Sequence, residues 1–396
     1  MKVHLKKFLA KFIINTKNFS EVIEMFIKKF IKKICAIAAA GVIGLTLTIS
    51  PVASDLTITN VAEAAQQKMS PAEQDLNDYL SNHSLKELNK TEEGQRLMYN
   101  YFCEKKGVSY DPNKNARLRN MMSQLTNAVS KIDPTVHDLP YVYFVNKDTS
   151  FNAFCSYAHV MSVNTGAFDL VANDDELAAI VGHEMGHGQK DHVYKGQKSA
   201  ERKQLIAGIA GIFIGNDIIG NIAGSILLNQ SIVHGNKRHE KEADVLAFDY
   251  IINTDYNPGA CAAVWQRVIE KFETTGEQNA VELFFTPSDH PNHLARRDKY
   301  AKRLTEYSGN KVSVKDGMLI INGKNFIIPA ATNNMSSIER SYFVLGSLAV
   351  AYHKGLNKYD ARVENDTVYL GTQPIITTAS GDESAQTIAD RLNSIK

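Results

Sequence analysis

The chain has 396 residues, of which 44% are hydrophobic and 22% charged, and its formal net charge is +1. This composition is typical of a globular protein that is long enough for two domains with a sizeable core. Basic residues cluster only near the N-terminus, so nothing in the charge pattern indicates nucleic-acid binding.

The N-terminal segment differs from the rest of the chain. A lysine-rich stretch at 25–33 is followed by an uncharged, mostly apolar run at 34–49. The small-x-small site Ala-Glu-Ala comes next, at 62–64. Basic, apolar, then small-x-small is the order of a secretory signal peptide. We therefore expect residues 1–64 to be a signal, with Met25 as an alternative start.

The apolar run has 16 residues, whereas a membrane span needs about 20. An uncleaved N-terminal anchor is the alternative to a cleaved signal. Nine of the 44 Lys and Arg but only four of the 43 Asp and Glu lie in residues 1–64, so the remainder has a formal net charge of −4. We expect an exported protein, periplasmic or extracellular, with membrane association if the signal is retained.

Three cysteines follow the signal, namely Cys103, Cys155 and Cys261. An odd and widely spaced set is not a disulfide framework. We expect three buried thiols, and one disulfide with one free thiol is the alternative.

The first part of the mature chain predicts helices joined by polar loops. Residues 71–80 and 116–132 carry apolar side chains at helical spacing, and the second segment ends before Pro134. Residues 140–145 are β-branched and aromatic, which predicts a buried strand.

The next helix carries the motif on which the functional interpretation rests. His183, Glu184 and His187 form H-E-x-x-H after an apolar run of helical appearance. Residues four apart share a helix face, so both imidazoles can turn toward one metal ion. Glu184 would lie beside the metal and take a proton from water, as in zinc hydrolases with this motif. The alternative is two ordinary surface histidines and a solvated glutamate.

A strand is predicted shortly before this helix. Residues 159–163 alternate between apolar and polar, which is consistent with a strand half exposed at a sheet edge. In zinc peptidases with this motif, such an edge commonly binds the substrate as an added strand. We therefore expect His159 and Met161 to line the substrate site and Asn152 to position the substrate backbone or the strand.

Residues 205–228 are apolar and rich in glycine. One interpretation is a membrane-touching hairpin beside the active site, and the other is two short helices packed closely through glycine. Asp217 lies in the middle of the run and would be costly within a membrane, so the sequence favours the buried pair.

A catalytic zinc takes three protein ligands and leaves one position open. Glu240 and Asp244 lie four residues apart at the start of a predicted helix. We expect Glu240 to be the third ligand and Asp244 to accept the other ring N–H of a ligand histidine. A charged, solvated helix start is the alternative.

Rival ligand sets fit less well. A metzincin has Gly three and His six residues after the second motif histidine, but Lys190 and Val193 hold those positions. Weaker candidates, which lie too close to the motif or lack a partner at helical spacing, are Glu201, His192, His234 and His239. His290 precedes a proline and could face the open metal position, or it could be a surface loop histidine.

The last part of the chain reads as a separate region. Hairpin-turn signals at 316–317 and 322–323 precede a predicted helix at 336–353, and residues 360–395 repeat this order. The order β-β-α written twice predicts a small α+β domain with internal pseudo-repeats. It carries no metal or nucleophile pattern, and a protein partner is one role that we consider for it.

Residues 116–304 resemble the HtpX-like and CAAX-prenyl-protease-like zinc metallopeptidases, which are gluzincins. The resemblance rests on H-E-x-x-H with the distant E-x-x-x-D at 240–244, together with Asn-Ala-Phe at 152–154, the strand at 159–163 and His-Pro at 290–291. The family has membrane-embedded and soluble branches, and this chain resembles the soluble one. It departs from the family after residue 305.

The resemblance implies one Zn²⁺ per chain, held by His183, His187 and Glu240. It also implies that Glu184 is the general base and that Asp244 supports a ligand. In similar periplasmic members, a histidine that matches His290 lies near the metal, where it blocks or assists the fourth position.

The expected fold is α+β, with a mostly helical zincin core and a small sheet in residues 65–305 and a β-rich domain in residues 306–396. The expected function is zinc-dependent cleavage of unfolded or extended extracytoplasmic proteins. Two alternatives are a chaperone or assembly factor for envelope proteins with a latent or regulatory metal site, and an adhesin-like binding module in the C-terminal domain.

Overall fold

The structure is a computed structural model of the chain. It describes residues 70–206, 237–273 and 293–396. The predictions for the signal peptide, for residues 207–228 of the glycine-rich segment and for His290 fall outside these residues. No helix in the described ranges is both long and apolar enough to cross a membrane.

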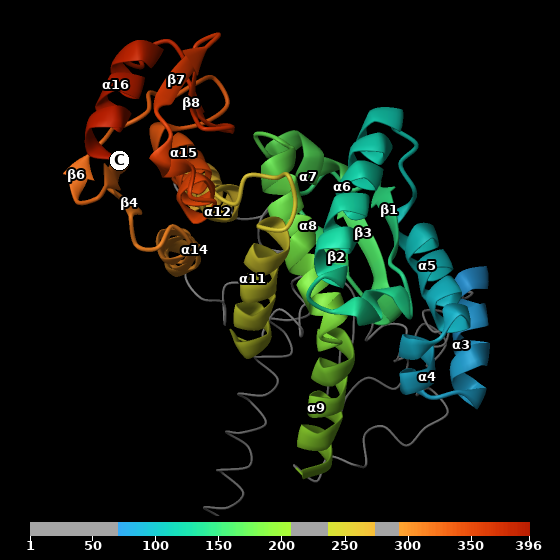
Figure 1. The fold of residues 1–396 in the computed structure, drawn as a ribbon. Coiled ribbons are helices and arrows are strands. Elements are labelled where there is room, and N and C mark those ends of the chain that lie inside the picture. Colours follow the sequence, from blue (N-terminus) through green and yellow to red (C-terminus); the bar gives the residue numbers. More distant parts are fainter. Residues whose placement is uncertain (1–69, 207–236, 274–292) are drawn as a thin grey trace, which may run out of the picture. The chain divides into compact units, whose positions relative to one another are not determined.

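Helices dominate the described residues, and Figure 1 shows their arrangement. The α-helices are α3 (Pro71–Asn82), α4 (Leu85–Lys90), α5 (Glu92–Lys106), α6 (Pro112–Ser130), α7 (Thr165–Leu170), α8 (Asp174–Gln189), α9 (His192–Ile206), α11 (Lys237–Ile251), α12 (Ala260–Val268), α14 (His293–Tyr307), α15 (Ser337–His353) and α16 (Ala385–Ile395). Shorter helical turns are η1 (Pro134–His137), η2 (Tyr157–His159), η3 (Ile269–Glu273) and η4 (Leu356–Lys358).

The strands form three small sheets of three strands each among these residues. The first consists of β1 (Val142–Asn146), β2 (Ala153–Cys155) and β3 (Val160–Asn164), the second of β4 (Val312–Lys315), β5 (Met318–Ile321) and β6 (Lys324–Asn325), and the third of β7 (Ala361–Glu364), β8 (Thr367–Leu370) and β9 (Gln373–Thr377). Helices with small sheets confirm the predicted α+β class.

The prediction that residues 159–163 form an edge strand is wrong. β3 lies in the middle of its sheet, parallel to β1 and antiparallel to β2, and all five of its residues are buried. Its polar residues Ser162 and Asn164 face a buried amide rather than water. The side-chain amide of Asn146 donates to Ser162 Oγ at 2.8 Å and to Asn164 Oδ1 at 2.6 Å. The edge strand beside α8 is β2.

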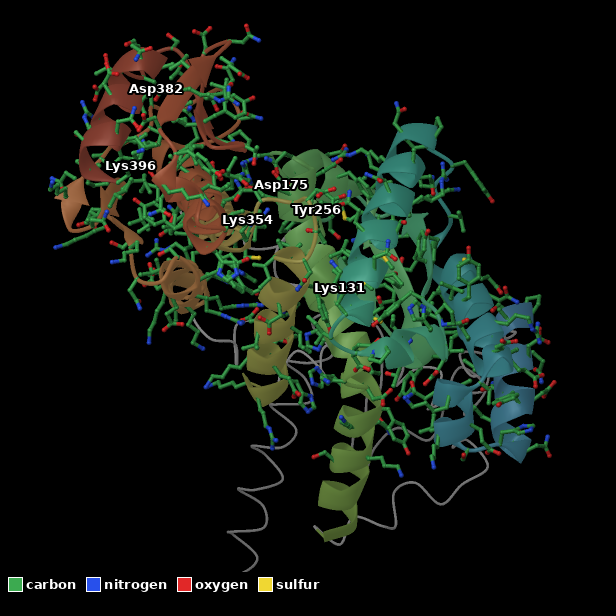
Figure 2. The ribbon with its side chains drawn as sticks, viewed as in Figure 1. Lys131, Asp175, Tyr256, Lys354, Asp382 and Lys396 are labelled. Atoms are coloured by element: carbon green, nitrogen blue, oxygen red, sulfur yellow. The ribbon has the colours of Figure 1, made fainter. Side chains whose placement is uncertain are left out.

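Helix α8 is positioned by its cap and by close packing. Asn173 caps it by accepting the N–H of Glu176 on its side-chain oxygen at 3.1 Å, and acidic residues fill the first turn, where the helix dipole favours them. α8 packs against α11, α12 and β2. Asp175 accepts the backbone N–H of Asn257 at 3.1 Å, next to Tyr256 (Figure 2).

The C-terminal region confirms the predicted repeat. Strands β4, β5 and β6 precede α15, and strands β7, β8 and β9 precede α16, so a third strand is added in each half. Turn residues Asp316, Asn322 and Asp366 adopt positive φ, as tight hairpin turns require. The proposed boundary at residue 305 stays a prediction, because hydrophobic side chains on both sides of it share one cluster.

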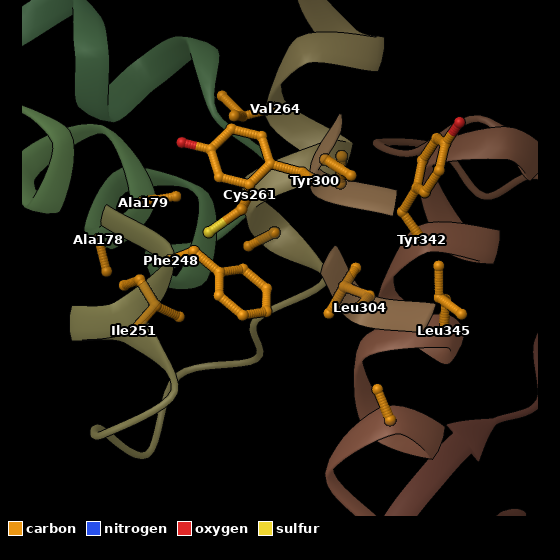
Figure 3. Close-up of a cluster of buried hydrophobic side chains, with 14 of the residues drawn as sticks. Ala178, Ala179, Phe248, Ile251, Cys261, Val264, Tyr300, Leu304, Tyr342 and Leu345 are labelled. Atoms are coloured by element: carbon orange, nitrogen blue, oxygen red, sulfur yellow. The ribbon is translucent and has the colours of Figure 1, made fainter. Parts of the chain in front are cut away.

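Figure 3 shows part of this cluster. Cys261 and Val264 of α12 lie with Tyr300 of α14, and the cluster continues to Tyr342 and Leu345 of α15. The packing of α15 against α12 and α14 thus joins the helices around H-E-x-x-H to the C-terminal region.

The three described cysteines are free thiols. Cys155 and Cys261 are buried, whereas Cys103 is only partly buried. The prediction of three buried thiols therefore holds for Cys155 and Cys261 but not for Cys103.

Candidate metal centre

Two helices bring the three predicted ligands together. His183 and His187 lie one turn apart on α8, and Glu240 lies in the first turn of α11. The Nε2 atoms of the two histidines are 3.1 Å apart, and they lie 3.4 Å and 3.2 Å from the two oxygens of Glu240. Each side chain is at most 6% exposed.

This geometry fits a tetrahedral zinc. Ligand atoms about 2.0–2.1 Å from a tetrahedral zinc are separated by roughly 3.3 Å. The two Nε2 atoms are 3.1 Å apart, and each lies 3.2–3.4 Å from a different oxygen of Glu240, so all three separations are close to that value. Two imidazoles and one carboxylate, converging in a buried place, are a known donor set for catalytic zinc.

Glu184 lies on the same helix turn, facing the sheet. Its Oε2 accepts the backbone N–H of Cys155 at 3.2 Å, and its side chain is buried. Cys155 is the last residue of the edge strand β2, so the carboxylate of Glu184 lies between α8 and that strand. This is the place where a base would meet a peptide added to the edge.

Asp244 supports His183 from the side away from Glu240. Its Oδ1 lies 3.2 Å from Nδ1 of His183 and accepts the hydroxyl of Tyr300 at 3.1 Å. Arg296 donates to both carboxylate oxygens, with Nε 3.0 Å from Oδ2. The carboxylate is therefore placed where it can orient the imidazole, and it also compensates the charge of a buried guanidinium.

The charged groups in this cluster shift one another's pKa values. Burial opposes ionisation of Asp244, but Arg296 and His183 outweigh it and lower its pKa to about 2. Burial also opposes a charge on His183, yet its hydrogen bonds to Asp244 and Glu240 raise its pKa to about 9. An excess of negative charge thus surrounds the ligand positions, which favours a divalent cation.

Sequence reasoning missed the residues that surround the ligands. Arg296, on α14, is 1% exposed, lies 3.5 Å from Glu240 and stacks on Trp265 at 3.7 Å. His192 lies 2.9 Å from His187 and is also buried. From the sequence alone, Arg296 has no predicted role, and His192 is only one of the weaker ligand candidates. Nothing in their spacing reveals which helix they meet.

Two of the predicted substrate-site residues point elsewhere. His159 lies in a helical turn before β3, where Nδ1 lies 2.6 Å from the carbonyl oxygen of Leu139 and the ring stacks on Tyr141. Met161 is fully buried in the central strand. Both residues were assigned to the substrate site because residues 159–163 were predicted to form an edge strand. Since that prediction is wrong, the assignment has no remaining support. Asn152 directly precedes the true edge strand.

Residues 112–304 match the family model described as peptidase family M48. This stretch is a peptidase family M48 domain. The predicted family and the predicted enzyme class, a metalloendopeptidase, are thereby confirmed. The domain covers α6 to α14, which includes both histidines of the motif, Glu240 and Asp244.

Part of this chain is similar to several named proteins. Metalloprotease LoiP of Escherichia coli is 27% identical over 188 residues, which are 46% of this chain and 70% of LoiP. Mitochondrial metalloendopeptidase OMA1 of Arabidopsis thaliana is 22% identical over 188 residues, 48% of this chain and 37% of that protein. The beta-barrel assembly-enhancing protease of Yersinia pestis is 22% identical over 176 residues, 41% of this chain and 34% of that protein. The match thus spans about a third of the length of the last two.

Proposed function

We propose that this M48 domain is a zinc-dependent endopeptidase that cleaves extended or unfolded segments of extracytoplasmic proteins. The observation that supports it most is the convergence of two imidazoles and one carboxylate at separations of 3.1–3.4 Å. His183, His187 and Glu240 would hold one zinc ion, whose chemistry is Lewis-acid activation of water and of the scissile carbonyl.

The residues around the ligands supply the remaining functions. Glu184 would take the proton of the attacking water and deliver it to the leaving amine. The N–H of Cys155, which it accepts at 3.2 Å, holds its carboxylate toward the substrate side. Asp244 would hold the imidazole of His183 in the tautomer that leaves Nε2 free to bind metal.

We assign the edge to which an extended substrate would add as a further strand to β2. Along β2, Ser156 donates to Val160 and Asn152 accepts from Asn164, so these alternate residues face the central strand. Ala153 and Cys155 therefore turn their backbone groups outward, and Cys155 directs its N–H to Glu184. Asn152 Oδ1 is buried and accepts no hydrogen bond from the described residues, which supports a role in holding the substrate backbone.

An extracytoplasmic location is supported by the N-terminal sequence and by the names of relatives. Residues 1–64 have the order of a secretory signal. One relative is named for enhancing beta-barrel assembly. We propose unfolded envelope proteins as substrates, and we leave His290 as a candidate for the fourth metal position. The alternative, an envelope assembly factor with a latent metal site, differs in predicting no cleavage.

The decisive experiment compares wild type with Glu184→Gln on unfolded casein, each with and without a zinc chelator. Gln is isosteric with Glu but cannot take the proton, so the variant should bind one zinc per chain and lose at least about 100-fold in rate, the lower range for general-base catalysis. Chelator should stop the wild type. Glu306→Gln, whose side chain is 55% exposed on α14, controls for nonspecific effects of a carboxylate-to-amide change.

Casein cleavage by Glu184→Gln at the wild-type rate would remove Glu184 from the mechanism. A wild type that binds zinc and leaves casein and other unfolded proteins intact would favour the latent assembly factor.

A further inference from the structure

His187 has a buried partner that is distinct from the carboxylate that supports His183. Nδ1 of His187 lies 2.9 Å from Nδ1 of His192, the first residue of α9. Nε2 of His192 in turn lies 3.3 Å from Oε2 of Glu242 on α11. His192 is 1% exposed, and its ring stacks on His239 with centroids 4.1 Å apart and planes 4° apart.

The chemistry of two imidazoles fixes the direction of these hydrogen bonds. One of two nitrogens 2.9 Å apart must donate and the other must accept. His187 can bind zinc through Nε2 only if that nitrogen carries no proton, so its proton sits on Nδ1. Nδ1 of His192 is then the acceptor, and the proton on Nε2 of His192 points to the Glu242 carboxylate.

We propose that His192 is a positioning residue that sets the tautomer and ring orientation of His187 for zinc, with Glu242 fixing the tautomer of His192. This rests on the proposed zinc site. The two ligand histidines are thus supported unequally, since His183 meets an ionised carboxylate and His187 meets a neutral imidazole. Stacking on His239 holds the ring of His192 in the plane that this hydrogen bond needs.

The geometry also explains why His192 is not itself a ligand. Its Nδ1 faces the back of the His187 ring, and its Nε2 faces Glu242, so neither nitrogen is directed to the point where the three ligands converge. Among the described residues, the group able to hold a metal comprises only His183, His187 and Glu240.

The test measures the zinc dissociation constant by competition with a chromophoric chelator, so it does not depend on peptidase activity. His192→Phe keeps a flat buried ring but offers no acceptor, and it should weaken zinc binding about 10- to 100-fold, the usual effect of losing such a partner. His192→Asn places an amide oxygen two bonds beyond Cβ, as Nδ1 is, and should restore affinity to within a few-fold of wild type. Circular dichroism and thermal unfolding of the zinc-free proteins report folding.

Each outcome decides the matter. The proposal is overturned if His192→Phe binds zinc as tightly as wild type, or if His192→Asn loses as much affinity as His192→Phe. Should His192→Phe not fold, Glu242→Ala serves instead, because its side chain is 43% exposed; unchanged zinc affinity in that variant overturns the proposal. A wild type that binds no zinc would instead refute the proposed function.

Discussion

At the scale of single residues, the centre is a cluster of buried charges in which one guanidinium compensates part of the negative charge. Arg296 is buried with Asp244 and lies 3.5 Å from Glu240, so one guanidinium serves two carboxylates. Burying any of these charges alone would be costly, and removing one partner leaves the others uncompensated. The charges around the proposed metal site are therefore also part of what stabilises the fold around it.

Asp244→Ala should show this directly. It leaves Arg296 buried with only the more distant Glu240, and we expect the zinc-free protein to lose about 3 kcal/mol of unfolding free energy. Asp244→Asn, which still accepts hydrogen bonds, should lose less. Urea unfolding of both variants measures the difference, and equal stability of Asp244→Ala and wild type would show that Asp244 does not compensate the buried charge of Arg296.

Site residues that lie one helical turn apart can be predicted from the sequence. The i, i+4 spacing placed His183 with His187 and Glu240 with Asp244, and chemistry then suggested that the two pairs meet. The role of Arg296 cannot be predicted in this way, because it depends on how α14 packs against α11. Arg296 and Asp244 are 52 residues apart in the sequence, and the periodicity of neither helix shows that they meet.

At the scale of elements, the ligands meet because α8 and α11 approach closely at Gly186. An added Cβ there would lie 3.1 Å from Ala243 Cα and 3.2 Å from its carbonyl oxygen. Gly186 directly precedes His187, and Ala243 lies three residues after Glu240. Spacing between these two helices therefore sets the distance between the second histidine and the carboxylate.

Gly186→Ala should push the two helices apart, because backbone atoms have little room to yield. We expect a loss of about 1–3 kcal/mol in stability and weaker zinc binding. Gly182→Ala is the matched control on the same helix, where the nearest atoms lie at 3.7–3.9 Å. It should be neutral or gain up to about 1 kcal/mol from helix propensity. Identical stability and zinc affinity in the two variants would show that the close approach does not matter.

The wrong prediction that residues 159–163 form an edge strand has its cause in how the strands pair. Alternation of apolar and polar residues predicts an edge strand only if the polar face meets water. Here Ser162 and Asn164 instead meet Asn146 on the neighbouring strand. A one-strand pattern cannot reveal a buried polar network built from two strands, so the strand was predicted and its place in the sheet was not.

At the scale of the whole molecule, a buried ion pair links the α8 end of the peptidase core to the C-terminal region. Arg267 of α12 lies 2.8 Å from Glu176 of α8 and 3.2 Å from Glu339 of α15. All three side chains are at most 3% exposed. Two carboxylates thus share one guanidinium, and burial of Glu339 raises its pKa to about 7, although Arg267 opposes the shift.

This raised pKa makes stability depend on pH. Between about pH 4.5, the ordinary pKa of a glutamate, and pH 7, folded Glu339 keeps a proton that the unfolded chain releases. Its contribution to stability is therefore present below pH 4.5 and declines as the pH rises to about 7. Glu339→Gln is neutral throughout and preserves the capping geometry at the start of α15.

Urea midpoints of wild type and Glu339→Gln should therefore diverge with pH. Relative to the variant, the wild type should become less stable from pH 5 to pH 7.5, whereas groups common to both cancel. A difference between the two proteins that stays constant over this range would mean that Glu339 titrates as an ordinary glutamate.

We propose that one zinc ion is held between two histidines one turn apart on α8 and a glutamate in the first turn of α11. Anomalous diffraction at the zinc edge from crystals of the zinc-loaded protein tests it most directly. We expect one peak per chain, about 2.0–2.2 Å from His183 Nε2, His187 Nε2 and an oxygen of Glu240. A peak elsewhere, or a zinc bound by the histidines with Glu240 turned away, would contradict it.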